Sequence, residues 1–261
     1  MTSHWGMYID LNCDVGEGST PEQLEIEQQV MQHVTSVNVA CGLHAGSPEL
    51  MHRTVRLAAQ LGLAVGAHPG FPDRDGFGRQ EQPWTADAIE SLIAYQVGAL
   101  RAVATLERAK LTHVKPHGAL YNMAGRDYSL ALAVAKAVAA VDRTLILVGL
   151  AGSRLIEAGT ETGLRVAAEA FVDRAYHRDG HLVSRSQPGA VVTDEAAVIR
   201  RVHDLIEHGW IWSVEGVAFF MNPDTICLHA DTPGAPALAR AIRAALIAAG
   251  ISPRRLDHFD A

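Results

Sequence analysis

The chain has 261 residues, of which 48% are apolar and 20% charged, and its formal net charge is −7. This composition is typical of a globular protein with a substantial core, and the length suits either one large α/β barrel or two ordinary domains. A negative net charge without a basic cluster argues against nucleic-acid binding. We therefore expect a globular protein with no nucleic-acid partner.

The cysteines and the N-terminus restrict the cellular setting. Cys13, Cys41 and Cys227 are far apart and form no C-x-x-C motif, so we expect three small buried side chains rather than disulfides or a zinc knuckle. The first 14 residues lack the basic stretch and apolar core of a signal peptide. No run approaches the roughly 20 apolar residues of a membrane span. These features predict a cytoplasmic protein that does not enter a membrane.

Short apolar runs alternate with longer helical patterns along the whole chain. The strands that we predict cover residues 7–11, 35–40, 64–66, 112–115, 144–149, 164–168 and 225–228. We expect an additional strand at 214–220 to pair with the last one through the turn Asn222-Pro223-Asp224. The predicted helices cover residues 21–32, 47–61, 85–106, 129–141, 194–208 and 235–249.

Strands that alternate with helices are typical of parallel strands joined by helical crossovers. The series continues without a glycine-rich linker, which favours one domain over residues 1–261. We find neither G-x-G-x-x-G nor G-x-x-x-x-G-K-[ST], so a Rossmann or P-loop fold is disfavoured. The sequence predicts an α/β fold in which seven strands form a single β/α barrel.

Six of the predicted strands end in polar or charged side chains. In chain order these are Asp10, Asn12 and Asp14; Asn38 and His44; His68; Lys115 and His117; Glu169, Asp173 and Arg174; and His229 and Asp231. Barrel enzymes place their active sites at the carboxyl ends of the strands. We therefore expect these side chains to share one cleft.

The first strand carries Asp10, Asn12 and Asp14 at every second position. An extended backbone directs alternate side chains to the same face, so the three should point the same way. Two carboxylates and an amide on one face can supply a general base, metal ligands or a hydrogen-bonding clamp. The alternative is a cluster of Asx turns that only ties the loop.

The fourth strand ends in the sequence HVKPHGALYN. Lys115 and His117 share a face by the same alternation, with Pro116 between them. Lys115 could neutralise an oxyanion or a phosphate, and His117 could transfer a proton near neutral pH. The alternative is a surface lysine beside a capping histidine. We expect His113 to lie deeper and to be structural.

Two loops contain further charged residues. Residues 70–80, GFPDRDGFGRQ, could close over a substrate with Arg79 reaching an anion, or could form a mobile surface loop. Residues 177–190 suggest a short hairpin that turns at Asp179-Gly180. There we expect His181 and Arg185 to be solvated rather than catalytic.

Six ordered motifs carry a family resemblance over residues 7 to about 245. They are DLNCDVGEG, NVACGLHAGSP, GAHPGFPDRDGFGR, HVKPHGALYN, FVDRAYHRDGHLVSR and ICLHADTPGA. Together they resemble the LamB/YcsF family, which implies a seven-stranded β/α barrel related to sugar and polysaccharide deacetylases. The resemblance also implies ATP-dependent hydrolysis of 5-oxo-L-proline to L-glutamate, by an A component of 5-oxoprolinase that works with the B and C components as its partners. The chain departs from the family pattern at Ser47, Gln80, Ala230 and Ser19-Thr20, which leaves open 5-oxoproline or a related lactam as the substrate.

The resemblance implies roles for the polar strand ends. ATP, with Mg²⁺, would phosphorylate the lactam oxygen and so activate the carbon for attack by water. Asp14 or His117 would be the general base, with Asp10 as a further catalytic carboxylate. Lys115 and Arg79 would stabilise phosphate or oxyanion charge, and Asn12 and Asn38 would orient the lactam. The remaining substrate-binding or cofactor-binding candidates are His44, His68, Glu169, Asp173, Arg174, His229 and Asp231.

Two other functions remain open. One is a metal-dependent deacetylase or amidohydrolase on a small amide or sugar, with Asp14, His44, His68 and His117 as a zinc-type site. Their spacing matches no standard metal motif, and Lys115 would repel the ion. The other is a non-catalytic component with a regulatory or scaffold role. The sequence also leaves open a homo-oligomer.

Overall fold

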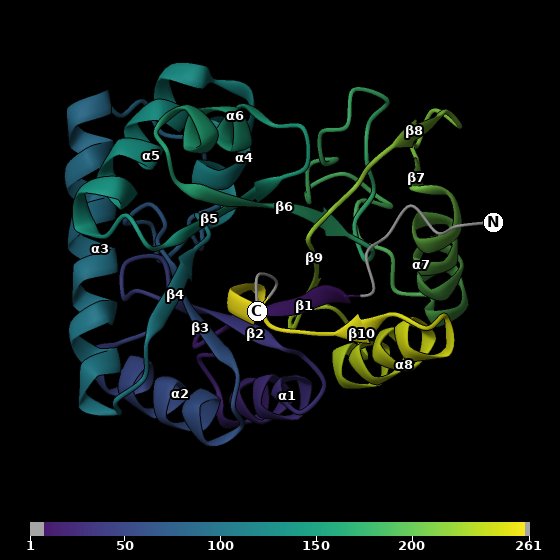
Figure 1. The fold of residues 1–261 in the computed structure, drawn as a ribbon, viewed down its shortest axis with the longest axis horizontal. Helices are drawn as coiled ribbons and strands as arrows, with labels where there is room; N and C mark the ends of the chain where they lie inside the picture. The colour runs from purple at the N-terminus through teal and green to yellow at the C-terminus, as the bar shows by residue number, and fades with distance from the viewer. Residues whose placement is uncertain (1–7, 259–261) are drawn as a thin grey trace.

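A computed structural model describes residues 8–258, and seven parallel strands within this range close into a barrel (Figure 1). Around the barrel they are β1 (Tyr8–Val15), β2 (Ser36–Ala40), β3 (Ala64–His68), β4 (Leu111–Val114), β5 (Ile146–Leu150), β6 (Arg165–Phe171) and β9 (Thr225–His229). β9 pairs with both β6 and β1, which closes the ring. The predicted seven-stranded β/α barrel is therefore confirmed. Met7, the first residue of the first predicted strand, lies outside the described residues.

Helices surround the barrel on the outside (Figure 1). They are α1 (Pro21–Met31), α2 (Pro48–Gln60), α3 (Ala86–Leu106), α4 (Gly118–Arg126), α5 (Tyr128–Val141), α6 (Arg154–Glu161), α7 (Glu195–His208) and α8 (Ala235–Ala248). Side-chain caps explain where several begin, because Thr20, Ser47, Thr85 and Asp194 each accept a hydrogen bond from a first-turn backbone N–H. A short β10 (Ser252–Pro253) pairs with the start of β1, and a 3₁₀ turn covers Leu256–His258.

The predicted pairing of residues 214–220 with the last strand is wrong. β8 (Ala218–Phe220) instead pairs antiparallel with β7 (Trp210–Trp212), outside the barrel. The reason is that β9 already has β6 on one side and β1 on the other, so it offers no free edge.

Helices α4 and α6 were not predicted. Only three residues separate α4 from β4, and α4 contains Gly118 and Gly125, which are poor helix formers. A single residue, Asp127, ends α4 and caps α5 by accepting hydrogen bonds from two backbone N–H groups. α6 has only eight residues, so its periodic pattern is short.

The side chains of β1 that point into the barrel are polar, while those on its other face belong to the hydrophobic core. Leu11 and Cys13 of β1 belong to the hydrophobic core, whereas Asp10, Asn12 and Asp14 hydrogen-bond to inward side chains of other strands. The expectation that these three share a face is thus confirmed. Their successive positions define three layers, with Asp14 nearest the carboxyl ends of the strands.

Gly66 of β3 makes room for one of the inward side chains. A Cβ atom at Gly66 would lie 2.1 Å from Nε2 of His113, so the imidazole occupies the space of a side chain there. A glycine inside a strand often marks such a close approach. His113 is fully buried, as expected.

Within residues 8–258, no helix combines the length and hydrophobicity that crossing a membrane requires.

Candidate active site

A cleft of about 510 Å³ opens at the carboxyl ends of the strands. Its lining includes most of the predicted residues from β1, β3, β4 and β9, namely Asp14, His68, Lys115, His117 and His229. A second cavity, of about 810 Å³, shares Glu17 and Arg79 with it and extends to the start of α8. A cleft is therefore present where the polar strand ends predicted it, but five of the predicted side chains line neither cavity: Asp10, Asn12, Asn38, Glu169 and Asp173.

Lys115 lies on the floor of this cleft with only 2% of its surface exposed. Its Nζ is 3.1 Å from Oδ1 of Asp14 and 2.9 Å from Oε1 of Glu169, and it also contacts Sγ of Cys227 at 3.1 Å. Burial acts to lower the pKa of Lys115, but Asp14, Cys227 and Glu169 outweigh it and raise the pKa well above its usual value. The ammonium is thus a fixed positive charge in a dry setting, and the surface-lysine alternative is wrong.

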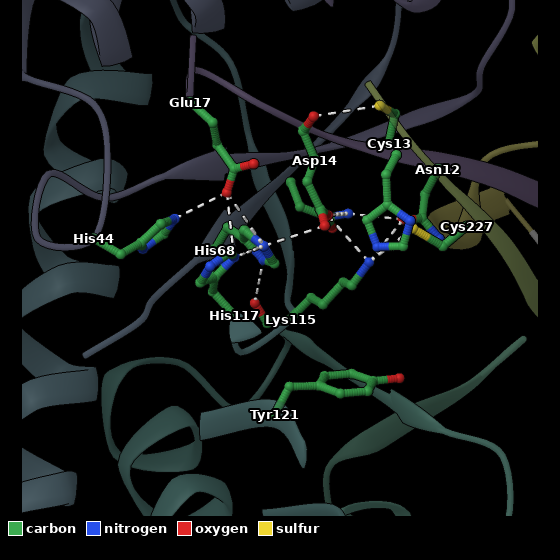
Figure 2. A network of polar contacts seen from close by, with 12 residues as sticks. Asn12, Cys13, Asp14, Glu17, His44, His68, Lys115, His117, Tyr121 and Cys227 are labelled. Carbon is green, nitrogen blue, oxygen red and sulfur yellow. Dashed lines mark hydrogen bonds and ion pairs between the residues drawn. The ribbon is translucent and has the colours of Figure 1, made fainter. Parts of the chain in front are cut away.

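Asp14 connects this ammonium to the histidines on the other side of the cleft (Figure 2). Its Oδ2 is 3.3 Å from Nε2 of His68, and its Oδ1 accepts a hydrogen bond from Asn38 at 2.8 Å. Burial acts to raise the pKa of Asp14, but His68 and Lys115 outweigh it and hold the pKa well below its usual value. An ionised Asp14 with so low a pKa is a weak proton acceptor.

Below the cleft floor lies a layer of buried amides and carboxylates. Nδ2 of Asn12 donates to Oε1 of Glu169 at 2.9 Å, and Nδ2 of Asn38 donates to Oδ1 of Asn12 at 2.8 Å. Tyr121 donates its hydroxyl to Oε2 of Glu169 at 2.8 Å, and Nε2 of His113 lies 2.8 Å from Oδ1 of Asn38. The structure thus places Asn12, Asn38 and Glu169 under the cleft, where they orient Lys115 and Asp14.

Asp10 lies deeper still, and it lines neither cavity. Its carboxylate accepts hydrogen bonds from the hydroxyl groups of Thr35, Ser36 and Thr225. Burial raises the pKa of Asp10 to about 6, although these hydroxyls oppose the shift. Because the rise along a strand is about 3.3 Å per residue, Asp10 lies about 13 Å from Asp14 along β1, toward the amino end. This placement does not bring Asp10 together with the other predicted catalytic residues.

A cluster of one carboxylate and three imidazoles lies beside Asp14. Oε1 of Glu17 is 2.9 Å from Nε2 of His44 and 3.2 Å from Nδ1 of His117, and the rings of His44 and His117 stack with centroids 3.8 Å apart. Burial lowers the pKa of His44 to about 3 and also lowers that of His117. Burial also acts to lower the pKa of His68, but the charge of Asp14 outweighs it, so that the pKa of His68 is raised.

His229, the last residue of β9, lines the same cleft. Its Nδ1 is 2.9 Å from Oδ2 of Asp173, and its ring stacks on Phe171 with centroids 5.4 Å apart. Burial acts to raise the pKa of Asp173, but His229 and hydrogen bonds outweigh it and lower the pKa to about 2. The ionised Asp173 therefore accepts a hydrogen bond from Nδ1–H of His229, which leaves Nε2 unprotonated in the neutral ring.

Charged residues of the two loops meet at the rim. Asp231 accepts hydrogen bonds from Arg79 at 2.7 Å and from Arg185 at 3.1 Å, and Arg79 also covers the ring of Phe77. Arg185, which was expected to be solvated rather than catalytic, is partly exposed and pairs with Asp231 at the rim. His181 lines the cleft as well. Arg174 is buried and donates to the carbonyl groups of Val183 and Ala190, so it holds the 177–190 loop in place.

Sequence reasoning missed three residues of the site. Glu17 follows Asp14 in the DVGEG segment, where the barrel rule could have indicated it. Tyr121 lies one turn into α4, a helix that was not predicted. Cys227 was expected only as a small buried side chain, but its sulfur contacts the Lys115 ammonium.

Comparisons with known proteins agree with the motif pattern. A model of the LamB/YcsF family matches residues 9–261. The A component of 5-oxoprolinase from Rhodopseudomonas palustris is 52% identical over 247 residues, which cover 94% of this chain and 97% of that protein. The protein of the same name from Chloroflexus aggregans is 50% identical, with coverage of 94% and 98%.

Solved structures give the same picture of the fold. The crystal structure of the lactam utilization protein from Thermus thermophilus superimposes with a TM-score of 0.87 at 43% identity, covering 95% of this chain and 100% of that one. A putative cellobiose-phosphate cleavage protein from Enterococcus faecalis is only 14% identical, with a TM-score of 0.55 and coverage of 96% and 97%, and shares the fold alone.

Proposed function

The chain belongs to the LamB/YcsF family, and we propose that it is the A component of a 5-oxoprolinase that hydrolyses 5-oxo-L-proline to L-glutamate with consumption of ATP. The names of its relatives and of the similar lactam utilization structure support the substrate class. Those names describe one component of a larger enzyme, which supports partner proteins that we take to be the B and C components.

The observation that carries the proposal is the buried Lys115 ammonium on the cleft floor. A lactam is a stable amide, and its opening develops negative charge on the carbonyl oxygen. A preorganised cation in a dry site stabilises such charge strongly, because no water must be reoriented. Asp14 and Glu169 keep the ammonium protonated and fix its position.

The reaction needs an activated carbonyl carbon. We propose that ATP, with its Mg²⁺, transfers a phosphoryl group to the lactam oxygen. Water then adds to the carbon, the C–N bond breaks as the nitrogen takes a proton, and a second water hydrolyses the acyl phosphate to the glutamate carboxylate and phosphate. The larger adjoining cavity is our candidate for the nucleotide phosphates, because Arg79 and the N-terminal turn of α8 line it.

The proton of the attacking water requires an acceptor in the cleft. The pKa of Asp14 is held too low for an efficient base, and Nδ1 of His117 faces Glu17 while its Nε2 donates to a backbone carbonyl. Within residues 8–258, no hydrogen bond engages Nε2 of His229, and Asp173 orients the ring through Nδ1. We therefore assign the general base to His229, with Asp173 as the positioning residue.

Reconstitution tests this function. The purified chain is combined with its two partner components, and glutamate and ADP are measured with 5-oxoproline as the substrate. The proposal predicts release of both products, which stops when ATP or this chain is omitted. The absence of glutamate from the complete mixture would contradict it.

A second candidate is a metal-dependent amidohydrolase, which the Glu17–His44–His68–His117 cluster favours. Such an enzyme would form its product without ATP. Glutamate release that persists in the absence of ATP would therefore select this candidate.

A further inference from the structure

Four ligand-type side chains meet at the carboxyl ends of the first barrel strands. The carboxylate of Glu17 and the imidazoles of His44, His68 and His117 each present one ligand atom, and these atoms all lie within 4.8 Å of one another (Figure 2). The residues come from the loops after β1 and β2, the end of β3 and the segment after β4, so the closure of the barrel brings them together.

Backbone carbonyl groups fix the protonation of two of the rings. Nδ1 of His68 is 2.7 Å from the carbonyl oxygen of Lys115, and Nε2 of His117 is 2.8 Å from that of Phe77. A carbonyl oxygen can only accept, so both of these nitrogens carry hydrogen. In the neutral rings, Nε2 of His68 and Nδ1 of His117 therefore present lone pairs.

These two lone pairs face each other. Nδ1 of His117 is 2.9 Å from Nε2 of His68, and Oε1 of Glu17, a third acceptor, is 3.2 Å and 3.8 Å from them. With both rings neutral, three acceptor atoms face one another, an arrangement that calls for a proton or a metal ion among them. A zinc ion with ligands at about 2.0–2.2 Å in a tetrahedron would hold them about 3.4 Å apart, close to the observed spacing.

Hydrogen bonds from neighbouring groups fix the orientation of these side chains, as is usual for the ligands of a metal site. Imidazoles that bind metal usually donate their other N–H to a carbonyl or carboxylate, as His68 and His117 do here. Glu27 accepts hydrogen bonds from the backbone N–H groups of residues 16–18, at 2.7–3.0 Å, and so fixes the loop that carries Glu17. His44 is held less firmly, because its buried Nδ1 has no partner among the described residues.

Two glycines bring the chain close to the rings. A Cβ atom at Gly70 would lie 2.6 Å from Nδ1 of His44, and one at Gly78 would lie 3.0 Å from Cδ2 of His117. The backbone thus presses against the imidazoles, and the rings have little freedom to turn away. The ligand atoms are preorganised.

We propose that Glu17, His44, His68 and His117 bind one divalent transition-metal ion of the zinc class. Three imidazoles and one carboxylate suit Zn²⁺, and also Co²⁺ or Ni²⁺. The carboxylate ligand is Glu17, because one of its oxygens lies within 4.8 Å of a nitrogen of all three imidazoles, whereas Asp14 is not part of this group. The site borders the cleft, which Glu17, His68 and His117 also line.

This site can be tested without substrate, so its outcome is independent of the proposed 5-oxoprolinase activity. The full chain is stripped with a chelator and titrated with Co²⁺, which gives visible absorption when bound by nitrogen and oxygen ligands, and then with Zn²⁺ as a competitor. We expect one Co²⁺ per chain, displaced by one Zn²⁺. The metal content of the protein as purified is measured in parallel.

Matched variants locate the ion. Glu17→Gln and His117→Gln should lose stoichiometric binding, while His52→Gln, which changes a histidine paired with Glu107 on the outer helices, should bind like the natural chain. Glu27→Gln acts only through the loop, so it should weaken binding by about 10–100-fold, as outer-shell changes do. Circular dichroism confirms that each variant is folded.

Two results would overturn the site. One is a folded natural chain that binds neither Co²⁺ nor Zn²⁺ at stoichiometric level, which would leave a shared proton between the rings. The other is equal binding by the natural chain and by folded Glu17→Gln and His117→Gln.

Discussion

Lys115 and Asp14 form a buried ion pair, with Nζ and Oδ1 3.1 Å apart, at the point where β4 and β1 reach the floor of the cleft. Oε1 of Glu169, on β6, lies 2.9 Å from the same Nζ. One ammonium between two carboxylates leaves a net negative charge in the floor. His68, whose pKa Asp14 raises, and any cation bound beside it offset that charge.

Replacement of Asp14 by Asn tests the role of its charge. Asn keeps the shape of the side chain, so we expect the chain to fold, but Lys115 and His68 lose their shared anion. Turnover in the reconstituted enzyme should fall by about 10²–10³-fold, as on loss of one preorganised electrostatic group. Turnover close to that of the natural chain would exclude Asp14 from the chemistry, and thermal melting serves as the control for folding.

Replacement of Gly66 by Ala should destabilise the protein, because the added Cβ would lie 2.1 Å from Nε2 of His113. The ring must move and break its contact with Asn38, so we expect a loss of about 1–3 kcal/mol in the free energy of unfolding. Gly98→Ala is the matched control, since its Cβ would meet no atom within 4 Å and Ala favours the helix by up to about 1 kcal/mol. Denaturant unfolding measures both, and equal stability of Gly66→Ala and the natural chain would refute the packing described here.

The buried carboxyl group of Asp10 should make the stability of the protein depend on pH. Its pKa rises from 3.8 to about 6 on folding, so between these values the folded state binds more protons than the unfolded state. Stability should therefore fall as the pH rises from 4 to 6 and then level off, by roughly 3 kcal/mol for this group. Asp10→Asn cannot ionise and should lack this component. The measured quantity is the difference in unfolding free energy between the two proteins, and a difference that stays constant from pH 4 to pH 7 would contradict the prediction.

Much of the fold and part of the site could be predicted from the sequence, for physical reasons that individual residues show. Strands buried on both faces are continuous apolar runs, and each run ends where side chains such as His68 and Lys115 reach the cleft. The alternation of Asp10, Asn12 and Asp14 predicted their common face correctly. It did not rank them by depth, although the rise per residue already separates Asp10 from Asp14 by about 13 Å.

The features of the site that could not be predicted depend on contacts between segments far apart in the sequence. Glu17 joins the cluster because Glu27 of α1 holds its loop, and Arg185 joins the rim because Asp231 attracts it. Neither contact leaves a periodic pattern in the sequence. The burial of Lys115 between two carboxylates is likewise a property of the closed barrel, since Asp14 and Glu169 come from β1 and β6.

The charge of Lys115 is tested most directly by the turnover of Lys115→Met in the complex with its partner components, measured as ATP-dependent release of glutamate from 5-oxoproline. Met keeps the apolar stem of lysine and removes the charge, and Lys110→Met makes the same change at an exposed position before β4. We predict that Lys115→Met loses about 10²–10³-fold in turnover. It should also lose stability, because two buried carboxylates are left without their cation. Lys110→Met should behave like the natural chain, and normal turnover by a folded Lys115→Met enzyme would exclude the Lys115 ammonium from catalysis.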